Sequence, residues 1–192
     1  MHSAGQHLYI IELQDMTGIP HTISNYRSVP APGLPGFDYH DVGVVVLPQN
    51  VPQSVVPSSQ YGVLPSAGLV DTLAMKAPVD LVGYGVTSQV KGGGVSPSDS
   101  WTWDRQRNFA TSTFISSPGI LASEFMKLTA NPGQDKGGTT FGDSGGPILM
   151  EGTRTILAIN AFVTNSNCNG VTYAQRIDIP DILAFIRTWL VI

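Results

Sequence analysis

The segment Phe141–Pro147, written FGDSGGP, contains a single serine among three glycines and is the strongest chemical signal in the chain. A nucleophilic serine needs a base to accept its proton, an acid behind that base, and hydrogen-bond donors for the developing oxyanion. Because glycine has no Cβ, the backbone N–H groups of Gly142 and Ser144 could face a substrate carbonyl. A chance GDSGGP in 192 residues is expected on the order of once in 10⁵ sequences. The segment predicts a nucleophilic Ser144 and directs the search to a histidine and an acid.

The composition favours many short strands over helices. The chain has 21 Gly and 14 Pro, 42% hydrophobic residues and only 12% charged residues. Such a mixture is typical of strands joined by tight turns. The formal charge of −4 offers no basic face for nucleic acid. No run approaches the roughly 18 apolar residues that span a bilayer. We therefore expect no nucleic-acid partner and no membrane segment.

Apolar and β-branched runs between turn signals predict a series of strands. The expected strands are Leu8–Leu13, His21–Ser28, Val42–Leu47, Leu81–Thr87, Phe109–Ser117, Phe125–Ala130, Pro147–Met150, Thr155–Val163 and Val171–Ile177. The polar segment from Pro48 to about Leu73 predicts the connection between two halves. Apolar residues from Ile182 to Leu190 recur at helical spacing, which predicts one C-terminal helix.

Two motifs together resemble the trypsin/chymotrypsin-like serine proteases. GDSGGP matches the nucleophile loop of that family, and His40–Leu47 (HDVGVVVL) matches its acid-bearing strand, with Asp41 as the acid. Val82–Gly85 (VGYG) and Cys168–Ala174 (CNGVTYA) resemble two further family segments. An alternative for Asp41 is a residue that merely caps the start of a strand.

The resemblance implies an all-β fold of two six-stranded antiparallel Greek-key β-barrels with a C-terminal helix. The N-terminal barrel would be incomplete in this chain. Residues 1–65 would form the remainder of that barrel, with Asp41 and the candidate base His2. Residues 66–192 would form the C-terminal barrel and the helix, with Ser144.

The identity of the base is open, because the family's T-A-x-H-C motif is not written in this chain. His40 adjoins Asp41 and, within a strand, would point to the opposite face. Met1-His2-Ser3 could be the end of the motif, which makes His2 the candidate base. The alternative is that the base is missing. In either case the first strands of the first barrel are missing, so we expect a fragment or a start at an internal methionine.

Positions within the resemblance also imply a substrate pocket. Gly138 would occupy the base of the primary pocket, and Val163 would narrow its mouth. Without a carboxylate at position 138 we expect no preference for Lys or Arg, and cleavage after a small or medium apolar residue. Thr140 stands where the family usually has a cysteine, which would leave Cys168 unpaired. The full set of expected substrate-binding residues is Gly138, Phe141, Ala161, Phe162, Val163 and Gly170.

The resemblance implies a serine endopeptidase in which Ser144 attacks, His2 transfers the proton and Asp41 holds the imidazole. The alternative is a protease-like binding protein that has lost its base. We expect no cofactor, no metal ion, a protein or peptide substrate, a monomer, and an extracellular or periplasmic location. In the family the acid beside the serine, here Asp143, often pairs with an N-terminus released by cleavage. The sequence suggests no such terminus, which leaves the state of the oxyanion hole as a question for the structure.

Overall fold

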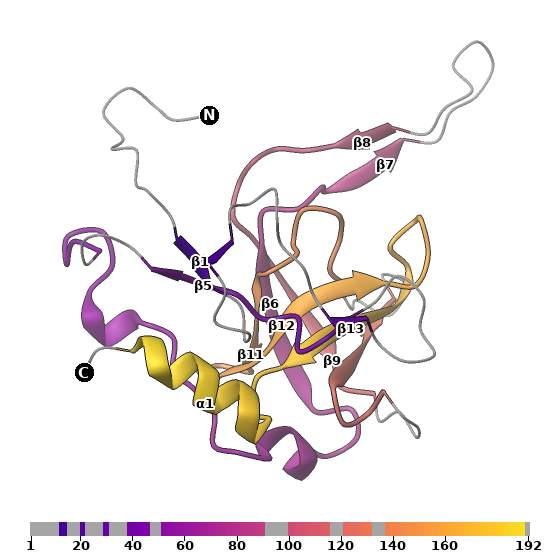
Figure 1. Ribbon diagram of the computed structural model, residues 1–192. Coiled ribbons are helices and arrows are strands. Elements are labelled where there is room, and N and C mark those ends of the chain that lie inside the picture. Colours follow the sequence, from indigo (N-terminus) through magenta and orange to yellow (C-terminus); the bar gives the residue numbers. More distant parts are fainter. Residues whose placement is uncertain are drawn as a thin grey trace. The chain divides into compact units, whose positions relative to one another are not determined.

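The computed structural model describes residues 12–14, 20–21, 29–30, 38–46, 51–90, 100–115, 121–131 and 137–190 (Figure 1). The chain divides into two compact units. One comprises Met1–Tyr61 with Asp181–Ile192, and the other comprises Gly62–Pro180. The assignment of residues 1–65 and 66–192 to two barrels remains a prediction.

The larger unit is built on one six-stranded antiparallel sheet, which curls in Figure 1. Its strands, in spatial order, are β10 (Phe125–Ala130), β13 (Gly170–Arg176), β12 (Ile156–Val163), β11 (Pro147–Met150), β6 (Pro78–Gly83) and β9 (Asn108–Thr113). The two edge strands meet just beyond β9, where Phe114 forms an antiparallel bridge with Leu128. The Ile115 N–H also donates to the Lys127 carbonyl at 2.8 Å. The sheet thus curls back on itself, which confirms the all-β, barrel-type fold.

The core of this unit follows from the alternation of side chains along the strands. In β6, Val79 and Leu81 are buried while Pro78 is exposed and Asp80 is half-buried. Their buried partners from the other strands and from the 3₁₀ turn η3 (Leu69–Thr72) are Val70, Met126, Leu128, Ile148, Leu157, Ala158 and Ala174. These apolar side chains fill the inside of the curl.

A short hairpin extends away from the curled sheet (Figure 1). It consists of β7 (Ser88–Val90) and β8 (Ser100–Thr102), paired with Gln89 opposite Trp101. The sequence predicted only a strand ending near Thr87 followed by a loop, so this hairpin was missed. It matters for the site because Trp101 contacts Phe141, as described below.

The smaller unit holds short strands and the helix. β1 (Glu12–Gln14) lies between β2 (Pro20–His21) and β5 (Val44–Val46), and β3 (Val29–Pro30) pairs with β4 (Asp38–Tyr39). The 3₁₀ turn η2 spans Ser58–Gln60. The predicted C-terminal helix is confirmed as α1 (Pro180–Trp189), with Ile182 and Leu183 buried. Within the described ranges, no helix is long and apolar enough to cross a membrane.

An ion network of buried Arg176 and Asp178 with exposed Asp71 fixes the end of β13 in the larger unit. The Arg176 guanidinium donates to both Asp71 oxygens at 2.8 Å and to both Asp178 oxygens at 2.9 Å. Asp178 is fully buried and also accepts the Val70 N–H at 2.8 Å. Burial alone would lower the pKa of Arg176, but Asp178 and Asp71 raise it above its ordinary value. The hydrogen bond from Arg176 lowers the pKa of Asp71.

Candidate active site

The serine loop, Phe141–Gly146, leads directly into β11, and its backbone is hydrogen-bonded to the neighbouring strand β12. The Gly145 N–H donates to the Asn160 carbonyl at 3.0 Å, and the Asn160 N–H donates to the Gly146 carbonyl at 2.9 Å. Within the loop, the Gly146 N–H donates to the Asp143 carbonyl at 2.9 Å. These bonds hold Ser144, which is exposed, at a fixed place beside β12.

Two N–H groups of the loop are left available, those of Gly142 and Ser144. Because a trans peptide points its C=O and N–H in opposite directions, each preceding carbonyl shows where the N–H is aimed. The Phe141 carbonyl accepts the Val86 N–H at 2.9 Å, so the Gly142 N–H points away from Val86. The Asp143 carbonyl accepts the Gly146 N–H, so the Ser144 N–H points away from Gly146. Across the described ranges, no hydrogen bond uses either donor.

The loop conformation at Gly142 depends on glycine. Gly142 has a φ of 96°, a region that side chains with a Cβ rarely adopt. A Cβ there would also come within 3.2 Å of the Gly85 Cα. The residue type at position 142 is thus dictated by the backbone that directs its N–H outward.

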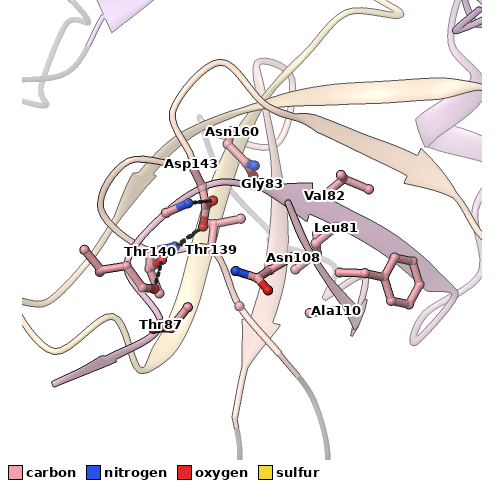
Figure 2. Close-up of a pocket in the computed structure, with 14 residues that line it drawn as sticks. Leu81, Val82, Gly83, Thr87, Asn108, Ala110, Thr139, Thr140, Asp143 and Asn160 are labelled. Carbon is pink, nitrogen blue, oxygen red and sulfur yellow. Dashed lines mark hydrogen bonds between the residues drawn. The ribbon is translucent and has the colours of Figure 1, made fainter. Parts of the chain in front are cut away.

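The Asp143 carboxylate is held on the inner side of the loop (Figure 2). It accepts the Gly85 N–H at 2.7 Å and, at its other oxygen, the Thr140 N–H at 2.8 Å. The Thr140 hydroxyl lies 3.0 Å from that same oxygen. A Cβ on Gly83 would lie 1.8 Å from an Asp143 oxygen, and one on Gly85 would lie 2.7 Å from it. The two glycines of the VGYG motif therefore make room for this carboxylate.

A cavity of about 180 Å³ opens beside Ser144. It is lined by Thr139, Thr140, Phe141, Ser144, Asn160, Ala161, Phe162 and Val163. The volume is below the roughly 300–1,000 Å³ of pockets for drug-sized ligands, so it suits a single side chain. Four of the six expected substrate-binding residues line it, namely Phe141, Ala161, Phe162 and Val163.

The other two expected pocket residues lie elsewhere. Gly138 lines a second cavity of about 200 Å³, shown in Figure 2, which also has Asp143 in its wall. A Cβ on Gly138 would lie 2.3 Å from the Ala130 Cβ, so close packing against β10 requires glycine there. Gly170 begins β13 with a φ of 98° and lines neither cavity.

Asn160 lines both cavities and was not singled out from the sequence. The residue is 5% exposed, and within the described part of the chain neither its amide nitrogen nor its amide oxygen has a hydrogen-bond partner. Asn160 is the one polar residue of β12 (ILAINAFV). A polar residue within an otherwise apolar strand is the sequence feature that could have indicated its role.

Aromatic contacts support both walls of the cavity beside Ser144. Phe162 stacks on Tyr173, with ring centroids 4.9 Å apart, and meets Phe125 edge-on at 5.3 Å. Phe141 meets Trp101 of the hairpin edge-on at 5.4 Å. Such pairs contribute about 0.5–1.5 kcal/mol beyond the burial of their area, so both walls have added stability.

Cys168 is a free, buried cysteine with a φ of 56°. Burial raises the pKa of its thiol, the Phe141 backbone lowers it, and the Asp143 charge raises it again. Position 140 holds a threonine, so the cysteine has no disulfide partner in a chain with one Cys. Within the described ranges, no group of His, Cys, Asp or Glu could hold a metal ion.

The two other predicted members of the catalytic set are not among the described residues of the larger unit. Asp41 belongs to the smaller unit, where it is half-buried between β4 and β5. His40 does not continue the strand as expected, because its φ is 56° and its carbonyl accepts the Val42 N–H in a tight turn at 2.7 Å. The argument from strand alternation against His40 therefore does not apply. His2 lies outside the described residues.

A curled antiparallel barrel that presents a serine on a glycine-rich loop, with two outward N–H groups, defines a serine-protease fold. The chain belongs to the Trypsin family, which it matches over residues 11–186. Among solved structures it is similar to a mutant of human heparin binding protein (CAP37), with a TM-score of 0.54 and 18% identity. The alignment covers 79% of this chain and 56% of that one, and it shows the fold alone. No curated protein matches the chain.

Proposed function

We propose that the protein is a serine endopeptidase that cleaves peptide bonds through an acyl-enzyme. Ser144 attacks the substrate carbonyl, and His2 accepts its proton and returns it to the leaving amine. Asp41 orients the imidazole of His2 and stabilises its positive charge. Water then attacks the acyl-enzyme, and the same base assists that step.

The observation that carries this proposal is the pair of available N–H groups at Gly142 and Ser144. The negative charge of a tetrahedral intermediate forms on the former carbonyl oxygen, and donors placed beforehand stabilise it without rearrangement. Both donors flank the serine that would attack, and both are aimed by bonds of their preceding carbonyls to Val86 and Gly146. Gly142 and Ser144 are both exposed, so these two donors are accessible to a substrate carbonyl.

The cavity beside Ser144 suggests which residue precedes the cut. Its lining is apolar at Phe141, Ala161, Phe162 and Val163, and none of its lining residues is charged. A charged substrate side chain would be desolvated there without a counter-charge, which is costly. We therefore propose cleavage after small or medium apolar residues. We also propose an extracellular or periplasmic location, since Trypsin-family proteins are typically secreted. A monomeric state remains a prediction.

Peptide hydrolysis by the full chain tests the proposed function. A panel of peptides that differ only in the residue before the cut should give the highest kcat/KM for Ala, Val or Leu. Fastest cleavage after Arg would contradict the proposed specificity. Ser144→Ala, His2→Ala and Asp41→Asn should each lower kcat by several orders of magnitude, since the three act as a unit. Unchanged kcat in His2→Ala would remove His2 from the mechanism.

A second candidate is a protease-like binding protein without a functional base. The similar solved structure is of a heparin binding protein, which makes this alternative worth testing. Heparin itself is not the ligand we would expect, because the chain has 14 acidic against 10 basic residues. A folded full chain that hydrolyses no peptide or ester would favour this alternative over the endopeptidase.

A further inference from the structure

The Asp143 carboxylate is held by neutral donors of its own unit. Its three possible donors are the Gly85 N–H, the Thr140 N–H and the Thr140 hydroxyl, at 2.7, 2.8 and 3.0 Å. In the part of the chain that the structure describes, no lysine, arginine or histidine forms an ion pair with it. Hydrogen bonds to an ionised acceptor are about twice as strong as neutral ones, so three such donors can hold this charge.

The Thr140 hydroxyl has two acceptors within reach, the Asp143 carboxylate and the Val86 carbonyl at 2.8 Å. A hydroxyl has one proton, and the charged carboxylate is the stronger acceptor. The Asp143 carboxylate that it holds connects the serine loop to the segment that follows β6, because it also accepts the Gly85 N–H. The Val86 N–H in that segment is the group that turns the Phe141 carbonyl, and with it the Gly142 N–H.

We propose that Thr140 is a positioning residue for the oxyanion hole. Together with the Gly85 N–H, its hydroxyl binds the Asp143 carboxylate, so that Asp143 needs no cation as its partner. The loop then directs the Gly142 and Ser144 N–H groups outward without an ammonium group from any other segment or chain. This inference rests on the proposed function for its catalytic consequence. The clamp on Asp143, meaning its hydrogen bonds from Gly85 and Thr140, can be tested without that function.

The matched variants are Thr140→Val, which keeps the shape and removes the hydroxyl, and Thr140→Ser, which keeps the hydroxyl. Losing a hydrogen bond to a charged group should lower kcat for a peptide or ester by about 10- to 100-fold, with KM changed less than threefold. Thr140→Ser should retain most of the wild-type kcat. Thr153→Val removes a hydroxyl that bonds the Met150 carbonyl on another turn, and it should leave kcat unchanged. A Thr140→Val variant with wild-type kcat would overturn the proposal.

A second arm tests whether a cation is needed. The dipeptide Ile-Val supplies a free ammonium group and an apolar side chain that could enter the cavity of about 200 Å³ beside Asp143. At millimolar concentration it should change the wild-type kcat less than twofold. A gain of tenfold or more would show that the loop lacks its competent shape without a cation, which contradicts the proposal.

Hydrogen exchange measured by NMR separates the clamp from catalysis. The Gly85 and Thr140 amide protons should exchange slowly in the wild type, at least 100-fold slower than in an unfolded chain. Gly85 should lose about tenfold of that protection in Thr140→Val and keep it in Thr140→Ser. Protected amides in a wild type that hydrolyses nothing would contradict the proposed function and support the clamp. A Gly85 amide that exchanges freely would contradict the clamp itself.

Discussion

Gly142→Ala is the substitution whose effect follows most directly from the serine loop. Alanine at the observed φ of 96° is strained, and its Cβ would come within 3.2 Å of the Gly85 Cα. Strain of this kind costs on the order of 1–3 kcal/mol. The loop should relieve it by rotating the Phe141–Gly142 peptide, which moves the N–H from the oxyanion position.

Loss of one oxyanion donor costs about 10²–10³ in kcat, or about 2.7–4 kcal/mol. We therefore expect Gly142→Ala to lower kcat by that factor and to lower the free energy of unfolding by about 1–3 kcal/mol. The assay is steady-state hydrolysis of the best peptide of the panel, together with urea unfolding followed by fluorescence.

Gly152→Ala provides the matched control, because Gly152 also has a left-handed φ, 66°, on the turn after β11. No atom lies within 4 Å of a Cβ placed there. This variant should lose a similar free energy of unfolding while kcat changes less than twofold. If Gly142→Ala keeps kcat within threefold of the wild type, the assignment of its N–H to the oxyanion hole is refuted.

Three further predictions concern buried polar groups of the larger unit. Arg176→Met leaves the fully buried Asp178 without its counter-charge, and it should lower the free energy of unfolding by about 3–5 kcal/mol in urea titrations. The double variant with Asp178→Asn should recover part of that loss, and a single variant that loses under 1 kcal/mol would contradict the role of the network. Asn160→Leu replaces an unpartnered amide by an apolar group of similar shape, so thermal unfolding should show a gain of about 1 kcal/mol. A loss above 1 kcal/mol would mean that the amide has a partner such as water. Since burial raises the pKa of Cys168, iodoacetamide at pH 8 should alkylate the folded chain at least tenfold more slowly than the urea-unfolded chain, as measured by mass spectrometry. Equal rates would show an exposed thiol.

The strands and the helix could be predicted where the spacing of apolar residues along the sequence is clear. β10 and β11 have the predicted bounds, because each is a short apolar run bounded by turn residues. α1 follows from apolar residues at helical spacing after Pro180. The hairpin of β7 and β8 could not be predicted this way. Its strands, SQV and SWT, are three residues long and depend on pairing with each other.

The site was predictable in its residue types and less so in its geometry. GDSGGP identified Ser144 and its flanking donors, because that segment is contiguous in the sequence. The clamp on Asp143 was not visible, since Gly85 lies 58 residues before the carboxylate that it binds. The turn at His40 was missed because the β-branched run after it suggested that the strand began earlier. Asn160 became notable only once the structure showed that it is buried and lines both cavities.

The most direct test of the central claim is the reaction of the folded full chain with diisopropyl fluorophosphate. The serine oxygen displaces fluoride from this reagent and becomes phosphorylated, which requires an activated hydroxyl and donors for the phosphoryl oxygen, so an ordinary exposed serine does not react. Peptide mapping by mass spectrometry should find one adduct per chain, on Ser144, absent from Ser144→Ala and from chain unfolded in urea beforehand. A folded chain that carries no adduct, or carries it on another residue, would contradict the assignment of Ser144 as the nucleophile.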